Sequence, residues 1–337
     1  MTFQEFKEKH QKTAVQEVSS STPKNPVVSV MVQTYQQKDF IRECLDGILM
    51  QKTTFDFEIL IGEDGSRDGT REICLEYANN FPGKIRLFLH HRENQIKVLG
   101  EATSNFNAFY NFYSARGNYI AFCEGDDFWE DPLKLQKQVD FLKFNTEFIF
   151  TYHRVDSVNE NSQSIPGLED YTQPELDIPS EDLLKGVYHP LLLSICFRNV
   201  LEEIPREMTQ VINVDTFLLS LLGRYGKAKF LREIKPAKYR KHSGGIWSTR
   251  GKKMKYLSKI ITFRELSRFY HRQEDVVLNE FYFNKLKSSY KMLINHYLKN
   301  GNLVSAAKSL VKLLMLRNKS QESRVKSQEP RKKRREK

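Results

Sequence analysis

Long apolar runs are absent from this sequence, and their absence limits where the protein can act. A segment that crosses a bilayer needs about 20 consecutive apolar residues, and no stretch of the 337 residues approaches that length. The opening residues, MTFQEFKEKHQK, also lack the apolar segment of a secretory signal peptide. We therefore expect a cytoplasmic protein.

Cysteine is scarce and scattered, which excludes two classes of small stabilised domain. The four cysteines, Cys44, Cys74, Cys123 and Cys196, show neither the spacing of a metal site nor that of a disulfide framework. Each lies among apolar neighbours in an expected helix or strand. We expect all four to be reduced core residues.

Acidic residues are too few to balance the basic ones, but most of the excess lies in one segment. The formal net charge is +11, and residues 317–337 hold ten Lys and Arg against three Glu, so +7 falls there and +4 on the rest. This run has no aromatic residues between its cations, so we expect a solvated tail and no nucleic-acid partner. The preceding segment, residues 303–316, could form an amphipathic helix that packs on the protein or touches an anionic membrane surface.

The apolar residues that are present predict a folded α/β protein. Hydrophobic residues make up 39% of the chain, which is too many for a disordered protein. Apolar, β-rich runs alternate with helical patterns, and this alternation predicts a Rossmann-like, doubly wound and mostly parallel sheet. The runs cover residues 27–32, 57–61, 85–89, 119–123 and 148–152.

Changes in pattern divide the chain into four segments. The alternation lapses near residue 154, another helical pattern surrounds Asp215, and the chain becomes helical and basic after Trp247. We expect a flexible polar leader at 1–25, an α/β domain at 26–250, a helical extension at 251–316 and a basic disordered tail at 317–337.

Two polar segments follow expected strands directly. QTYQQ, with Thr34 and Tyr35, follows the first, and GEDGSRDGT, with Asp64, follows the second. Ligands of open α/β sheets bind at the carboxyl ends of strands, where an acidic side chain can accept hydrogen bonds from a base or ribose. An ordinary turn with a helix cap would use the same residue types.

The segment EGDDFW follows the fourth expected strand. Glu124, Asp126 and Asp127, with Gly125 between them, place three carboxylates in four residues. They repel one another unless a cation or protons compensate, and oxygen ligands suit Mg²⁺ or Mn²⁺ bound to a diphosphate. A solvated acidic turn would show the same pattern.

Two further residues become candidates through their surroundings. His242 lies in YRKHSGGIWS, where the glycine pair would let a loop close over a phosphate. Asp215 begins the helical pattern in INVDTFLLSLLGRYG. Pattern alone leaves His242 a possible surface histidine and Asp215 a possible helix cap.

Taken together and in this order, these segments resemble the inverting family-2 glycosyltransferases, which have the GT-A fold. VSVMVQTYQQ is similar to the family's opening strand and nucleotide-side loop, and the Glu63–Ser66 run is similar to its acidic Gly-Ser motif. EGDD resembles its D-x-D-D segment, with Glu124 replacing the first aspartate. Asp215 stands at the place of the catalytic base, preceded by Val214 rather than the frequent glutamate.

The resemblance implies a role for each candidate residue. Asp215 would deprotonate the acceptor hydroxyl, and Asp126 would bind Mn²⁺ or Mg²⁺ with support from His242. The implied nucleotide and donor contacts are Thr34, Tyr35, Asp64, Glu124, Gly125 and Asp127.

The resemblance also implies a substrate class and a cellular setting. The donor would be a nucleotide sugar, a UDP-sugar first of all, with a hexosyl or N-acetylhexosaminyl group. The acceptor would be a hydroxyl of a glycan or lipid-linked molecule in surface polysaccharide or glycoconjugate synthesis. Such work could place the protein at the inner face of the cell membrane, as a peripheral protein.

Two other functions fit parts of the sequence. A sugar-nucleotide nucleotidyltransferase would share the α/β core and the carboxylates, and would release pyrophosphate from a nucleoside triphosphate. Such enzymes carry a glycine-rich and basic loop near the first strand, where this chain has QTYQQKD. A non-catalytic basic binding protein would use only the RKKRREK run.

Overall fold

The computed structural model describes residues 1–165, 175–245 and 250–328, with residues 317–328 described through their backbone only. The chain forms two compact units, Met1–Thr249 and Arg250–Lys337.

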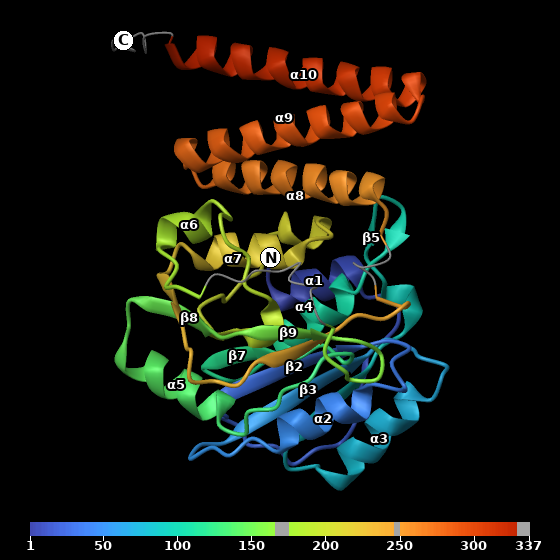
Figure 1. The fold of residues 1–337 in the computed structure, drawn as a ribbon, viewed down its shortest axis with the longest axis vertical. Coiled ribbons are helices and arrows are strands. Elements are labelled where there is room, and N and C mark those ends of the chain that lie inside the picture. Colours follow the sequence, from blue (N-terminus) through green and yellow to red (C-terminus); the bar gives the residue numbers. More distant parts are fainter. Residues whose placement is uncertain (166–174, 246–249, 329–337) are drawn as a thin grey trace, which may run out of the picture. The chain divides into compact units, whose positions relative to one another are not determined.

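A central sheet organises the first unit (Figure 1). Strands β4, β3, β2 and β7 run parallel, while β10 lies antiparallel between β7 and β8. All five strands expected from the sequence are present, and they form the expected doubly wound, mostly parallel sheet. The strand order across the sheet is β1 (Gln16–Glu17), β4 (Ile85–Leu89), β3 (Phe57–Glu63), β2 (Val28–Thr34), β7 (Tyr119–Phe122), β10 (Cys196–Arg198), β8 (Phe148–Tyr152) and β11 (Lys227–Phe230).

Helices cover both faces of this sheet. The apolar sides of α2, α3 and α5 share one core with alternate residues of the parallel strands, as the period-two pattern of a strand requires. Helix α4 packs on β2 and β3 from the opposite face (Figure 1). The helices are α1 (Phe3–His10), α2 (Ile41–Leu49), α3 (Thr70–Asn80), α4 (Asn105–Ser114), α5 (Lys134–Phe144), α6 (Ser180–Leu184) and α7 (Val214–Leu222).

Short elements complete the unit. Parallel strands β12 and β9 form a small second sheet, and β5 pairs antiparallel with β6. All four cysteines are free and buried, as expected. The short elements are β5 (Lys97–Val98), β6 (Glu101–Ala102), β9 (Val155–Val158), β12 (Ala237–Arg240) and the 3-10 turns η1 (Arg92–Asn94), η2 (Leu192–Ser194) and η3 (Met208–Gln210).

The segment expected to be a loose leader is instead part of the fold. Thr2 and Glu5 form a capping box that starts α1. Phe6 is fully buried and stacks on Phe106 of α4, with ring centroids 5.3 Å apart. Burial of one phenylalanine contributes about 1.5–3 kcal/mol, and β1 adds pairing with β4. The expectation of a flexible leader is therefore wrong for these residues.

The second unit is helical, as the sequence indicates. It contains α8 (Lys252–Arg272), α9 (Val276–Lys299) and α10 (Leu303–Gln328), and α9 packs against both of the others. Residues 317–328 were expected to begin a disordered tail, but their backbone continues α10, because no proline or glycine interrupts the helical pattern there. The rest of that tail lies outside the described residues. None of the helices in the described part of the chain has the length and apolar character needed to cross a bilayer.

The parallel strands bring the expected site segments to one edge of the sheet. Thr34 at the end of β2 is in register with Glu63 at the end of β3, and β7 ends beside them just before the EGDD turn. Because parallel strands share a direction, their carboxyl ends lie at the same edge, where ligands of such sheets bind.

Candidate active site

An aromatic ring, a guanidinium and a carboxylate form the first part of the site. Asp64 follows β3, and its Oδ2 accepts a hydrogen bond of 2.5 Å from Nη1 of Arg92 in η1. The same guanidinium lies 3.8 Å above the ring of Tyr35, which is 41% exposed. Desolvation raises the pKa of Asp64 to about 6, against the opposing charge of Arg92.

The remainder of the GEDGSRDGT loop holds the backbone in place. Buried Glu63 pairs with Arg71 at 2.5 Å and accepts the backbone N–H of Ser66 at 2.6 Å. The hydroxyl oxygens of Ser66 and Thr70 accept backbone N–H groups of the loop after β2. These side chains fix the two loops to each other. The third acid of the loop, Asp68, accepts the backbone N–H groups of Lys38 and Thr70, which leaves Asp64 as the acid of this loop that we assign to a ligand.

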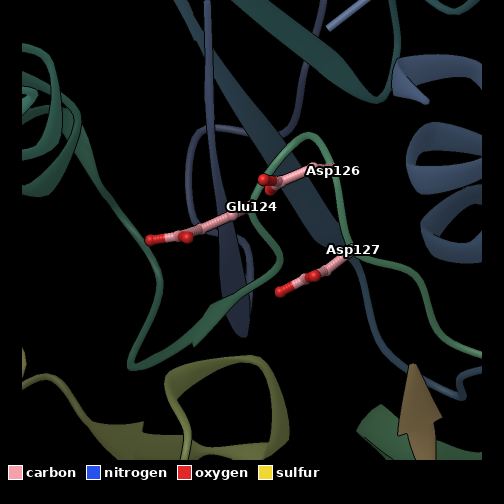
Figure 2. Close-up of side chains that lie close together, drawn as sticks. All are labelled: Glu124, Asp126 and Asp127. Carbon is pink, nitrogen blue, oxygen red and sulfur yellow. The ribbon is translucent and has the colours of Figure 1, made fainter. Parts of the chain in front are cut away.

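The acidic turn after β7 collects three carboxylates. Each of Glu124, Asp126 and Asp127 offers an oxygen, and these oxygens lie within 4.8 Å of one another. Figure 2 shows the three side chains leaving the turn toward the same side. Burial, followed by the negative charges of Asp126 and Glu124, raises the pKa of Asp127 well above its usual range.

Glycine is required between the first two of these acids. A Cβ at Gly125 would lie 2.4 Å from Oε1 of Gln37 and 2.9 Å from Oγ1 of Thr34. Both oxygens are buried, and neither makes a hydrogen bond within the residues that the structure describes. The turn thus packs directly on the loop after β2, with two polar atoms available beside it.

His242 lies against the acidic turn. Its Nε2 is 3.0 Å from Oδ2 of Asp126, and its ring packs edge-on against Phe40 with centroids 4.8 Å apart. Its side chain is 9% exposed, so this histidine is part of the site rather than the surface. The neighbouring residues 246–249, which include Trp247 and Ser248 of the same sequence segment, lie outside the described residues.

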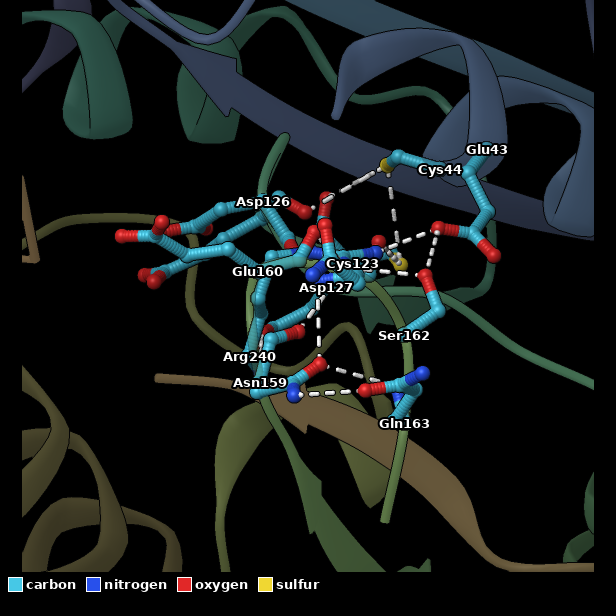
Figure 3. A network of polar contacts seen from close by, with 12 residues as sticks. Glu43, Cys44, Cys123, Asp126, Asp127, Asn159, Glu160, Ser162, Gln163 and Arg240 are labelled. Carbon is cyan, nitrogen blue, oxygen red and sulfur yellow. Dashed lines mark hydrogen bonds and ion pairs between the residues drawn. The ribbon is translucent and has the colours of Figure 1, made fainter. Parts of the chain in front are cut away.

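Arg240, at the end of β12, holds the acidic turn in place through hydrogen bonds. Its backbone N–H donates to Oδ1 of Asp127 and its Nε donates to the carbonyl of Asp126, both at 2.9 Å. Its guanidinium also pairs with Glu43 of α2 and donates to Ser162 (Figure 3). Arg240 is 2% exposed, so it acts as a buried clamp that holds the carboxylates in position.

Asp215 meets a histidine that the sequence analysis did not single out. It lies in the first turn of α7, and its Oδ2 is 2.8 Å from Nε2 of His189. Its other oxygen accepts the N–H of Thr216 at 2.7 Å. Desolvation would raise the pKa of Asp215, but the charge and hydrogen bond of His189 outweigh it and lower that pKa. Reciprocally, desolvation is outweighed by Asp215 and the pKa of His189 rises.

The charge of Asp215 reaches the acidic turn. Although Glu124 keeps solvent exposure, desolvation, the charge of Asp126 and then that of Asp215 raise its pKa to about 8. Contacts join the remaining candidates, since the N–H of Asp64 donates to the carbonyl of Thr34 at 3.1 Å and Thr34 touches Gly125. The candidate residues therefore occupy one continuous site.

The donor set of the acidic turn fits a hard divalent cation. Burial and neighbouring negative charges raise the pKa of Glu124 and of Asp127, a repulsion that a bound cation would offset. Carboxylate oxygens are ligands that suit Mg²⁺ or Mn²⁺. His242 is placed to join or orient them.

Comparisons with known proteins give the chain a family context. Residues 29–190 match the sequence profile of the family described as Glycosyl transferase family 2. An uncharacterized protein of Mycobacterium tuberculosis is 34% identical over 226 residues, which are 65% of this chain and 60% of that protein. The uncharacterized glycosyltransferase EpsJ of Bacillus subtilis is 35% identical over 105 residues, covering 31% of this chain and 27% of EpsJ. The chain thus spans about 60% of its mycobacterial relative.

Solved structures share the fold. S. aureus TarS 1-349 in complex with UDP superposes with a TM-score of 0.50 at 15% identity, covering 81% of this chain and 72% of that chain. The same protein in complex with UDP-GlcNAc gives a TM-score of 0.50 at 14% identity, covering 84% and 90%. Asp215 and His242 lie beyond the residues matched by the family profile.

Proposed function

We propose that this chain, whose residues 29–190 match the profile of the family 2 glycosyltransferases, moves one sugar, with inversion, from a nucleoside diphosphate donor to a hydroxyl acceptor. UDP is the nucleotide that we favour, since TarS, a protein with the same fold, was crystallised with UDP and UDP-GlcNAc. The transferred group is a hexosyl or N-acetylhexosaminyl residue. The acceptor is a glycan or lipid-linked hydroxyl in polysaccharide or glycoconjugate synthesis.

One observation carries the proposal: the acidic turn adjoins two groups of side chains that a nucleotide sugar could use. Tyr35, Asp64 and Arg92 offer a ring, an acceptor and a cation, and Thr34 joins Asp64 to the turn. Asp215 is near enough to Glu124 for its charge to raise the pKa of that carboxyl. A nucleoside diphosphate sugar has matching parts: a base, a diphosphate and an anomeric carbon.

Each part of the site then has one task. Tyr35 and Asp64 hold the nucleoside, while Thr34 and Gly125 contact the donor between the nucleoside and the acidic turn. Glu124 and Asp127 orient the donor ribose and sugar. Asp126, with His242, would hold Mn²⁺ or Mg²⁺. The bound cation would stabilise the negative charge on the leaving diphosphate. Asp215 accepts the proton of the acceptor hydroxyl while the acceptor oxygen bonds to the anomeric carbon from the face opposite the nucleotide. The bond between the anomeric carbon and the diphosphate oxygen breaks, the nucleoside diphosphate leaves, and this single displacement inverts the anomeric centre.

Thermal unfolding in a panel of nucleotides tests the donor assignment. With Mn²⁺ present, UDP and UDP-sugars should raise the unfolding temperature more than GDP, dTDP or ADP, because a ligand that binds only the folded state stabilises it. Asp64→Asn should reduce this preference, since the amide replaces an acceptor with a mixed donor and acceptor.

The exposed Asp140 on α5 offers a matched control. Asp140→Asn makes the same chemical change away from the site and should leave the panel unchanged. Stabilisation by nucleoside triphosphates with pyrophosphate release, in place of a response to nucleotide sugars, would contradict the proposal.

We further propose that His189 positions Asp215 and keeps it ionised. Substitution of the imidazole by His189→Ala removes the partner that lowers the pKa of Asp215, leaving desolvation to raise it. A base must be ionised, so activity falls as the pH drops through its pKa. The acidic limb of the kcat profile should therefore move to higher pH, by about one unit or more. A pH profile of turnover measures the shift.

Two further variants separate this role from a structural one. His189→Gln keeps a hydrogen-bond donor without the charge, so its acidic limb should lie between those of the parent and His189→Ala. His271→Ala changes an exposed histidine at the end of α8 and should leave the limb unmoved. An unshifted limb in His189→Ala would show that the pair has no part in catalysis.

A further inference from the structure

Helix α10 has two apolar faces, and only one of them is buried. Ala306, Ser309 and Leu313 are 4%, 8% and 5% exposed, and they recur three and four residues apart, as one stripe of a helix does. This stripe accounts for the packing of α10 on α9. A helix with one partner needs no second apolar stripe.

A second apolar stripe nevertheless runs along α10 and is open to solvent. Its large members are between 45% and 68% exposed. Their spacings of one, four, seven and eight residues place them within an arc of about 140° at 100° per residue. Single exposed apolar residues are common, but a continuous stripe marks an interaction surface. The stripe consists of Leu303, Val304, Leu310, Val311, Leu314 and Met315.

Positive charge borders the stripe. Lys308 and Lys312 are exposed and lie one turn apart beside it, and residues 303–316 contain no acidic residue. The sequence that follows, residues 317–337, adds ten basic residues against three acidic ones. A partner for this face must therefore offer both an apolar region to bury the stripe and negative charge to pair with the lysines.

We propose that the exposed stripe of α10, with Lys308 and Lys312, docks on the surface of an anionic lipid bilayer. A helix of this design lies in the plane of the bilayer, with its apolar side among the acyl chains and its cations at the headgroups. A second copy of the chain would instead bring the two lysine rows close to each other, and like charges oppose that pairing. The inference stands on α10 alone and does not depend on the reaction that the first unit performs.

Sedimentation of the full chain with vesicles tests the proposal. The chain should sediment with vesicles of phosphatidylcholine and phosphatidylglycerol, should bind vesicles of phosphatidylcholine alone much less, and should be released by added salt. Leu310→Ser with Leu314→Ser should weaken binding about tenfold or more, because two inserted side chains are lost. Lys308→Glu with Lys312→Glu should weaken it by a similar factor and reduce its salt dependence, while the basic residues of 317–337 remain.

Matched variants on the same unit control for general changes in hydrophobicity and charge. Val276 and Val277 at the start of α9 are 73% and 72% exposed but lie outside the stripe. Val276→Ser with Val277→Ser, and Lys252→Glu with Lys253→Glu on α8, should bind anionic vesicles nearly as the parent does. Circular dichroism should show unchanged helix content in every variant.

Three results would overturn the proposal. The first is a chain that fails to sediment with anionic vesicles. The second is a stripe variant that binds them as tightly as the parent. The third is a dimer in solution that Leu310→Ser with Leu314→Ser dissociates while vesicle binding stays unchanged, which would assign the stripe to self-association.

Discussion

Asp215→Asn is expected to lower turnover about 10²- to 10⁴-fold, the range over which a positioned general base contributes. Asparagine keeps the shape of the side chain, but its single amide oxygen can accept only one of the two hydrogen bonds that the carboxylate makes with His189 and Thr216. It also cannot take a proton from the acceptor. The loss should therefore appear in kcat, while the Kd for the nucleotide stays within a few-fold of the parent value. Release of nucleoside diphosphate in the presence of acceptor measures kcat, and calorimetry measures the Kd for the nucleotide.

The turnover of Asp215→Asn must be compared with that of a variant that carries the same chemical change outside the site. Asp140→Asn, on the exposed side of α5, should keep parent turnover. Equal turnover in Asp215→Asn and the parent would mean that Asp215 serves only the start of α7. The base would then have to be sought in the acceptor-side loop, at Glu169 or Asp170, both of which lie outside the described residues.

Asp126→Asn is expected to remove most of the dependence of nucleotide binding on Mn²⁺ or Mg²⁺. Changes in groups that merely orient metal ligands cost about 10- to 100-fold in metal affinity or activity, and loss of a charged ligand should cost at least that much. Calorimetry with and without Mn²⁺ gives the readout. In the parent, addition of a chelator should weaken nucleoside diphosphate binding by a similar factor.

The thermal unfolding temperature of Asp126→Asn shows whether this substitution disturbs the fold. Arg240 holds Asp126 through its carbonyl rather than its carboxylate, so the substitution should leave the thermal unfolding temperature of the nucleotide-free protein nearly unchanged. Identical affinity with metal and with chelator in the parent would remove the metal from the proposed function altogether.

The strands of the sheet could be predicted because their signal is local. Residues 27–32 form an almost unbroken apolar run, as a strand buried on both faces requires, and β2 lies there at Val28–Thr34. Strand β10 gave no comparable signal. It has three residues, Cys196–Arg198, and it is a strand because Cys196 pairs with Ala121 on one side and Thr151 on the other. Composition and period carry no information about such distant partners.

The leader was misjudged for a different reason. Its signals were local but short: a threonine three residues before a glutamate, and two phenylalanines three apart, Phe3 and Phe6. A helix of eight residues is unstable alone. Aromatic side chains of α4 stabilise this helix: the ring centroid of Phe3 lies 5.1 Å from those of Tyr110 and Tyr113. The pattern of apolar residues in one helix does not show which other helix it packs against.

The acids of the site could be proposed from the sequence because strands deliver them to a common edge. Asp64 and Asp126 each follow an apolar run, so their neighbourhood follows from the direction of the strands. His189, Arg92 and Arg240 could not be found in this way. Each comes from a connection or a short strand, and each matters only through a contact with a residue distant in sequence: Asp215, Asp64 and Asp127.

The clamp formed by Arg240 has a consequence for the order of events during synthesis. The parallel part of the sheet can assemble once β7 has left the ribosome, because β2, β3 and β4 precede it. The acidic turn follows at once, but the backbone group that anchors Asp127 arrives 113 residues later. At a synthesis rate of about 5–20 residues per second, the nascent chain carries an unclamped cluster of carboxylates for several seconds or more. Ribosome-bound chains stopped before β12 should fold this part of the sheet yet hold divalent cations poorly.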